Sequence, residues 1–141
     1  MNPAVPNRWF DRARLRRQAA ELLKYYSPDY FSAKQRFLAA CNRVGLAHQS
    51  LPIHAPSPNS EPLTIDIAVA GSEKPTLALV VSSGVHGIEG FFGSAVQLAF
   101  LEQLAPDWQP PEGAALVFLH ALNPYGFAWQ RRFNEDNVDL N

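Results

Sequence analysis

A histidine and a glutamate three positions apart are the residues in this sequence best suited to bind a metal ion. They are His86 and Glu89, within the run Ser-Gly-Val-His-Gly-Ile-Glu-Gly at 83–90. A neutral imidazole nitrogen and a carboxylate oxygen can both approach one zinc ion at about 2.0–2.2 Å. Positions i and i+3 face the same way where a chain begins to coil. Taken alone, however, the pair is better explained as a solvated loop histidine and a glutamate at a helix N-terminus.

A second polar segment contains arginines and asparagines that suit a hydrolytic site. It begins with Asn-Pro-Tyr-Gly at 123–126, continues with Arg131 and Arg132, and ends with Asn-Val-Asp-Leu-Asn at 137–141. An Asn-Pro-x-Gly stretch is by itself only an ordinary turn. A guanidinium near a metal pair is more informative, because its fixed fork suits a carboxylate or a developing oxyanion.

The elements around these segments predict an α/β arrangement. Apolar residues recur at helical spacing in three stretches, and three others are apolar or alternating, as strands are. Two of the strands are continuously apolar, which is typical of strands buried on both faces. The expected helices cover 9–26, Ser32 to Val44 and 91–104, and the expected strands cover 63–69, 77–81 and 114–119, with loops at 51–62, 71–75 and 123–141.

The strand, helix and strand after residue 75 indicate a βαβ unit, whose ligand site lies beyond the carboxyl ends of the strands. We therefore expect the segments 82–90 and 120–126 to meet. His120, at the end of its strand, is the best local candidate for a third metal ligand, although a hydrogen-bonded role behind the site fits it better. We expect His48 and His54 to be surface residues.

Composition and charge favour one globular domain. The chain has 141 residues, of which 47% are hydrophobic and 18% are charged, and its formal net charge is −1. This balance is unlike that of disordered chains, and no global field favours nucleic acid. The basic cluster at 8–17 is interpreted as the solvated face of a helix, and the acidic pair Glu135 and Asp136 as a solvated turn. The oligomeric state does not follow from the sequence.

The single cysteine and the lengths of the apolar runs indicate where in the cell the protein is expected. Cys41 has no partner for an internal disulfide and is expected to be a small core residue. There is neither a signal-peptide h-region nor an apolar run of about 18–20 residues. We therefore expect no membrane span and a cytoplasmic location.

The motifs, taken in order, resemble the zinc carboxypeptidase (M14-like) superfamily, and most closely its bacterial branch, the DUF2817 family. That branch shows a Ser-Gly-x-His-Gly-x-Glu-Gly-Phe run and an Asn-Pro-Tyr-Gly-Phe-Ala run followed by Asn-Glu-Asp-Asn-Val-Asp-Leu-Asn, and both are present here. The likeness extends to the helical stretch from Tyr25 to Phe37. It implies an α/β fold of the phosphorylase/hydrolase-like type, with a mixed sheet and helices on its faces.

The resemblance also implies roles for individual residues. His86 and Glu89 match zinc ligands, so zinc is the expected cofactor. Arg132 matches an arginine that polarises the scissile carbonyl and stabilises the oxyanion. Asn141 matches an asparagine that helps to hold a substrate carboxylate, and Arg131 is the neighbouring candidate for a shifted register.

The family pattern continues beyond the last residue of this sequence, Asn141. The resemblance places a substrate-binding arginine, the third zinc ligand and the general-base glutamate there. A catalytic zinc normally needs three protein ligands. We therefore expect residues 1–141 to be the N-terminal part of one zinc-carboxypeptidase-like domain, with a helical lead-in at 1–50, an α/β core portion at 63–141 and an exposed sheet edge or apolar face. Asp139 is expected to support the loop or a ligating histidine.

Three functions follow from the resemblance. The first is zinc-dependent hydrolysis of a peptide or amide bond near a free carboxylate, with a small peptide as substrate. The second is deacylation of an N-acyl-amino acid, of the succinylglutamate desuccinylase/aspartoacylase type. The third is an inactive fragment that only binds a metal, a ligand or a partner.

Overall fold

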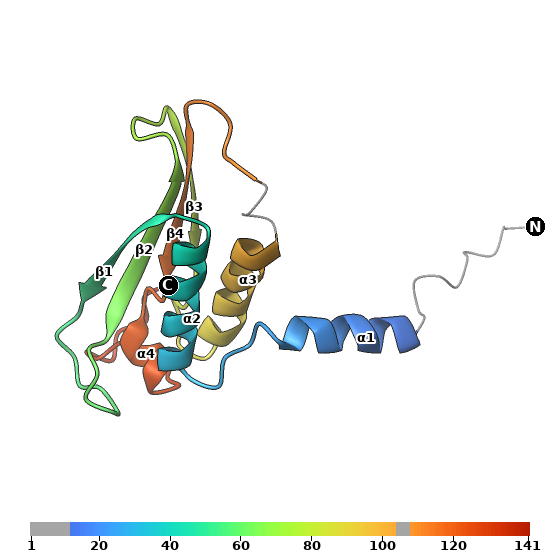
Figure 1. Cartoon of the computed structure of the whole chain (residues 1–141). Coiled ribbons are helices and arrows are strands. Elements are labelled where there is room, and N and C mark those ends of the chain that lie inside the picture. The colour runs from blue at the N-terminus through green and yellow to red at the C-terminus, as the bar shows by residue number, and fades with distance from the viewer. Residues whose placement is uncertain (1–11, 104–107) are drawn as a thin grey trace, which may run out of the picture.

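The fold is a four-stranded mixed sheet with helices packed against it (Figure 1). The computed structural model describes residues 12–103 and 108–141. Strands lie in the order β1-β2-β4-β3; β3 and β4 are parallel and the other neighbours are antiparallel. The α/β class and the βαβ unit are thus confirmed. The elements are α1 (Arg12–Leu23), α2 (Tyr30–Arg43), β1 (Ala47–Pro52), β2 (Thr64–Gly71), β3 (Leu77–Ser82), α3 (Gly90–Gln103), β4 (Ala114–His120) and α4 (Pro124–Ala128).

The main core lies between one face of the sheet and the helices α2 and α3. Alternate residues of β2 and β4 point into it, which reflects the two-residue period of a strand. Phe37 is fully buried there, and burial of such a ring contributes roughly 1.5–3 kcal/mol. Cys41 is also fully buried, as expected, and burial raises the pKa of its thiol to about 12. The buried members are Tyr25, Phe37, Ala40, Cys41, Ala68, Ala70, Ala95, Leu98, Leu101, Leu116 and Phe118.

The start of α2 is fixed by a capping residue. The side chain of Asp29 accepts a hydrogen bond from the backbone N–H of Ser32 at 2.7 Å. This bond satisfies a donor that the helix itself cannot pair. Helix α2 begins at Tyr30, two residues before the expected start at Ser32.

Two elements were not expected from the sequence. Residues 47–52 form β1, although residues 47–50 were assigned to a helical lead-in and 51–52 to a loop. Every residue of β1 is exposed, and its sequence shows no alternation of apolar and polar residues. The strand is defined by its pairing with β2. The short helix α4 lies within the stretch expected to be loop. The expected helical residues 9–11 and 104 lie outside the described residues.

Helix α3 is apolar on nearly all sides. Ala95 and Leu98 face the core, yet Phe92 is 64% exposed and Val96 is 49% exposed on the other side. Helices with apolar residues all round are usually covered on all sides. Among the described residues, no helix is both long enough and apolar enough to cross a membrane.

Strand β3 departs from its predicted environment. The sequence indicated burial on both faces, but β3 lies at the edge of the sheet, where Leu77 is 69% exposed and Leu79 is 63% exposed. The prediction of a doubly buried strand is therefore wrong for this chain, whereas the expected exposed edge is present. An apolar edge strand with free backbone groups is a site for pairing with another polypeptide.

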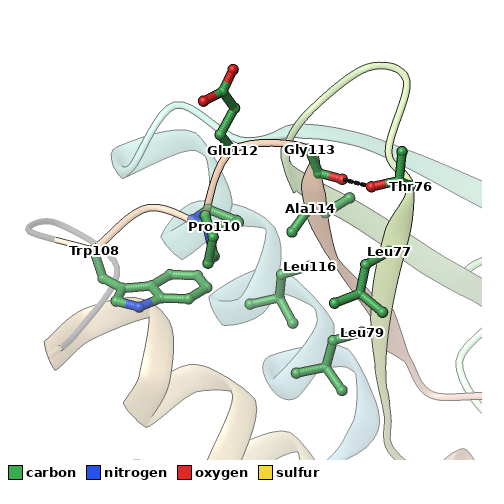
Figure 2. Close-up of a pocket in the computed structure, with 11 residues that line it drawn as sticks. Thr76, Leu77, Leu79, Trp108, Pro110, Glu112, Gly113, Ala114 and Leu116 are labelled. Atoms are coloured by element: carbon green, nitrogen blue, oxygen red, sulfur yellow. Dashed lines mark hydrogen bonds between the residues drawn. The ribbon is translucent and has the colours of Figure 1, made fainter.

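A pocket of about 340 Å³ lies at the amino ends of β3 and β4 (Figure 2). Leu79, Leu116 and Trp108 line it, and Thr76 closes one end by donating a hydrogen bond to the carbonyl of Gly113 at 3.2 Å. Since β3 and β4 are parallel, the pocket and the segments that follow the two strands lie at opposite ends of the sheet. It is therefore separate from the candidate metal residues.

The exposed β3 edge leads to a first prediction. Leu79→Lys should lower self-association of the purified chain, because a charge interrupts the apolar edge. Sedimentation velocity at increasing protein concentration measures this effect. Gln49→Lys is the matched control, since it adds the same charge to the polar edge strand β1. Equal self-association in the Leu79→Lys and wild-type chains would show that β3 does not mediate the contact.

Candidate metal centre

The pairing of β3 with β4 continues beyond the ends of both strands. The N–H of Ser83 donates to the carbonyl of Leu119 at 3.0 Å, and that of Leu122 donates to the carbonyl of Ser83 at 2.9 Å. Asn123 then donates its N–H to the carbonyl of Gly84 at 2.8 Å. The expectation that segments 82–90 and 120–126 meet is confirmed.

His86 and Glu89 converge at the start of α3. The Nδ1 atom of His86 lies 2.7 Å from a carboxylate oxygen of Glu89, and the two side chains are 13% and 61% exposed. Two atoms that bind one tetrahedral zinc lie about 3.3 Å apart, so a small increase in the distance between Nδ1 of His86 and the Glu89 oxygen would make room for an ion. The backbone holds both residues, because Gly90 donates to the carbonyl of His86 at 3.2 Å and Gly93 donates to that of Glu89 at 3.1 Å. Nitrogen and oxygen donors in this arrangement fit zinc.

Asp139 binds the other ring nitrogen of His86. Its Oδ1 lies 2.9 Å from Nε2 of His86, and its Oδ2 accepts from Nε of Arg132 at 2.9 Å. The hydrogen bonds from Arg132 and then from His86 lower the pKa of Asp139 to about 2, so the carboxylate stays ionised at neutral pH. Asp139 thus faces Nε2 of His86, and Nδ1 is the ring nitrogen that faces Glu89. The expected supporting contact of Asp139 is therefore present.

The two candidate arginines have different surroundings. Arg132 shares Asp139 with His86 and is half exposed, whereas Arg131 donates to the side-chain carbonyl of Asn137 at 3.0 Å. The guanidinium of Arg131 also lies 5.9 Å from the ring centre of Tyr125. Arg131 thus holds the loop together, and Arg132 is the arginine connected to the candidate ligands.

Asn134, a member of the motif run at 134–141 to which no individual role was assigned from the sequence, organises the loop that carries Asp139. Its side-chain carbonyl accepts from the N–H groups of Asp136 at 3.1 Å and Val138 at 2.8 Å. Its own N–H donates to the carbonyl of Val138 at 3.0 Å. Asparagine commonly folds a turn in this way, and an asparagine two residues before an aspartate was the available signal. The predicted substrate contact of Asn141 stays a prediction; its N–H donates to Asp139 at 3.1 Å.

His120 lies in the interior and bonds to other side chains. It is fully buried, and its Nε2 lies 2.9 Å from the hydroxyl of Ser94. Its Nδ1 faces a carboxylate oxygen of Asp66 at 3.7 Å. Within residues 12–103 and 108–141, no three His, Cys, Asp or Glu side chains are grouped so as to hold a metal. His48, His54, Glu135 and Asp136 are exposed, as expected.

A family model matches the part of the chain that contains these segments. The model of the family described as "Protein of unknown function (DUF2817)" matches residues 26–141. The chain belongs to the DUF2817 family. No curated protein matches this DUF2817 chain.

Three solved structures share the fold of this DUF2817 chain. Two, each named a "putative metallopeptidase", come from Shewanella amazonensis SB2B (29% identity, TM-score 0.59) and Shewanella denitrificans OS217 (29%, 0.54). A third with that name, from Shewanella baltica OS155, has 24% identity and a TM-score of 0.56, and supports the fold alone. The matches cover 79–80% of this chain but only 38–39% of those chains. The chain thus spans about two fifths of their length.

Close backbone packing at Gly87 yields a prediction for this DUF2817 site. A Cβ atom there would lie 2.0 Å from the carbonyl oxygen of Gly126 and 2.3 Å from that of Arg131. Gly87→Ala should therefore lower the free energy of unfolding by about 3 kcal/mol or more. Chemical denaturation measures the change.

The control for this prediction is Gly45→Ala. Gly45 has a positive φ of 71° but no atom within 4 Å of an added Cβ, so its replacement costs only backbone strain, about 1–2 kcal/mol. If Gly87→Ala were no more destabilising than Gly45→Ala, the close approach of the 131–139 loop would be refuted.

Proposed function

We propose that this chain supplies part of the active site of a zinc-dependent hydrolase, with His86 and Glu89 as two of the metal ligands. One observation carries the proposal: the carboxylate of Asp139 holds one nitrogen of His86, while the other nitrogen faces Glu89. Metal-binding histidines usually have such a partner on the ring nitrogen that does not bind the metal. The names of the Shewanella relatives also support a metallopeptidase.

Each residue then has a chemical task. When bound, zinc polarises a carbonyl and lowers the pKa of a bound water. Asp139 keeps the proton of His86 on Nε2 and so presents a free Nδ1 to the metal. Arg132 uses Nε for Asp139, which leaves the donors on its two Nη atoms for a substrate oxygen that gains negative charge. Within residues 12–103 and 108–141, no third side chain is grouped with this pair so as to hold a metal, so only these two ligands are assigned.

The proposed substrate is a small peptide or an acyl-amino acid with a free carboxylate near the bond that breaks. Arg132 and Asn141 lie on either side of Asp139 in the sequence, and both bond to its carboxylate. The guanidinium of Arg132 therefore lies beside the candidate ligands, and the backbone N–H of Asn141 helps to hold Asp139. Anionic substrates suit such donors, because a guanidinium binds a carboxylate through two parallel hydrogen bonds.

Zinc binding by the purified chain tests the proposed ligands. His86→Ala and Glu89→Ala should each abolish measurable binding, and Asp139→Asn should weaken it about 10–100-fold because the ring loses its charged partner. Competition with a chromogenic chelator gives the affinity, and circular dichroism checks the fold. His48→Ala serves as the control, since His48 is exposed on β1. Equal zinc affinity in wild type and His86→Ala would refute this assignment.

Hydrolysis assays separate the three candidate functions. The zinc-loaded chain is incubated with blocked dipeptides and, separately, with N-acyl-amino acids, and released amino acid is measured. Release from peptides supports the peptidase, and release from acyl-amino acids supports the deacylase. Zinc binding without either product shows that these residues alone do not form a complete hydrolase, as the binding-only alternative requires. Activity that survives both chelation and Arg132→Ala would contradict the proposed centre.

A further inference from the structure

Three buried side chains from three elements meet behind the candidate metal centre. They are Asp66 of β2, Ser94 of α3 and His120 of β4, and their exposure is 0%, 4% and 0%. The hydroxyl of Ser94 lies 2.9 Å from Nε2 of His120, and Nδ1 of His120 lies 3.7 Å from Oδ2 of Asp66. These residue types also form the triad of serine hydrolases, but here the hydroxyl is packed inside the core. A substrate cannot reach this hydroxyl, so we interpret the cluster as structural and not as a catalytic triad.

The hydrogen bonds around Asp66 determine where the proton of His120 belongs. Oδ1 of Asp66 accepts from the hydroxyls of Ser50 and Thr64, so Oδ2 is the oxygen that faces His120. Among the described residues, Oδ2 of Asp66 and Nδ1 of His120 have no other partner, and a buried acceptor needs a donor. A proton on Nδ1 satisfies both atoms after a small approach. Nε2 is then an acceptor, so the hydroxyl of Ser94 donates to it.

Two aromatic contacts hold the imidazole of His120. The ring of Phe37 stacks on it with centres 4.6 Å apart and planes 14° from parallel, and Phe127 lies 6.5 Å away. Phe127 also fills the space beside Gly90, where an added Cβ would lie 2.8 Å from its ring. His120 is thus connected to the first residue of α3 by packing and to Ser94 by a hydrogen bond.

We propose that His120, as the Nδ1–H tautomer between Asp66 and Ser94, is a positioning residue that fixes the first turn of α3 and, with it, the His86–Glu89 pair. Ser94 lies one turn beyond Gly90, whose N–H donates to the carbonyl of His86. Ala121, directly after His120, donates its N–H to the hydroxyl of Ser83 at 3.3 Å. The Asp66–His120–Ser94 contacts and the adjacent bond from Ala121 to Ser83 therefore anchor both chain segments that leave the sheet towards the candidate centre. The metal-related part of this inference rests on the proposed function.

The tautomer is tested in the wild-type chain without metal. Long-range ¹H–¹⁵N spectra of the histidine rings, with His120 assigned by the loss of its signals in His120→Asn, should show a protonated Nδ1 and a bare, hydrogen-bonded Nε2. A proton on Nε2 instead, or on both nitrogens, would overturn the proposed hydrogen-bond order. The tautomer itself is read from the wild-type chain, and His120→Asn serves only to assign the signals.

Positioning is tested with Ser94→Ala, Ser94→Thr and the matched control Ser50→Ala. Ser50→Ala also removes one hydroxyl, but Thr64 still donates to the same oxygen of Asp66, so the contacts of His120 and Ser94 remain. Amide exchange at Gly90 and Gly93 should become about tenfold faster in Ser94→Ala and stay unchanged in Ser50→Ala. Ser94→Thr, which keeps a hydroxyl, should restore the wild-type rate. Unchanged exchange in Ser94→Ala, or equal acceleration in Ser50→Ala, would refute the role.

Metal affinity then separates positioning from general stability. In fully folded chains, Ser94→Ala should bind Co²⁺ about tenfold more weakly than wild type, and Ser94→Thr and Ser50→Ala should match wild type. Equal Co²⁺ affinity in Ser94→Ala and wild type would limit the network to a structural role. If the wild-type chain binds neither Co²⁺ nor Zn²⁺, the proposed function fails, whereas the tautomer and exchange measurements still decide the proposed network.

Discussion

The candidate centre depends on parallel pairing between β3 and β4 that persists after both strands have ended. Each strand end is followed by a turn, and backbone hydrogen bonds from Ser83, Leu122 and Asn123 hold the two turns side by side. Such bonds are insensitive to side-chain identity, so the geometry of the pair His86 and Glu89 is set by the sheet. Chemistry is thereby placed on a rigid element, which suits a site that must hold an ion within a few tenths of an ångström.

Charged side chains of opposite sign surround His86 at the candidate centre. Glu89 and Asp139 flank His86, and Arg132 neutralises the outer oxygen of Asp139. A carboxylate with a bound guanidinium remains ionised, and it accepts a hydrogen bond from the histidine rather than taking up its proton. As a result, Nε2 of His86 is bound to Asp139, and Nδ1 is the nitrogen available to a metal. In the proposed function, Glu89, which is largely exposed, is the group whose negative charge attracts the ion.

Local patterns predicted the elements well, and nonlocal pairing accounts for the differences. The helical period and the apolar runs placed α3, β3 and β4 within one or two residues, because those signals lie within each segment. The position of β4 between β2 and β3 could not be read in the same way, since strand order depends on contacts between distant residues. For the same reason β3 was expected to be buried, and β1, whose residues carry no pattern of their own, was assigned to other states.

The candidate site shows the same division between local and distant signals. His86 and Glu89 are neighbours in the sequence, so spacing alone suggested that their side chains converge, and the resemblance brought in Arg132 and Asp139. The environment of His120 was different, because its partners Ser94 and Asp66 are far away along the chain. A histidine at the end of a strand fits either a ligand or a buried anchor. The decisive fact is that both of its nitrogens face side chains inside the core, which leaves neither one for an ion.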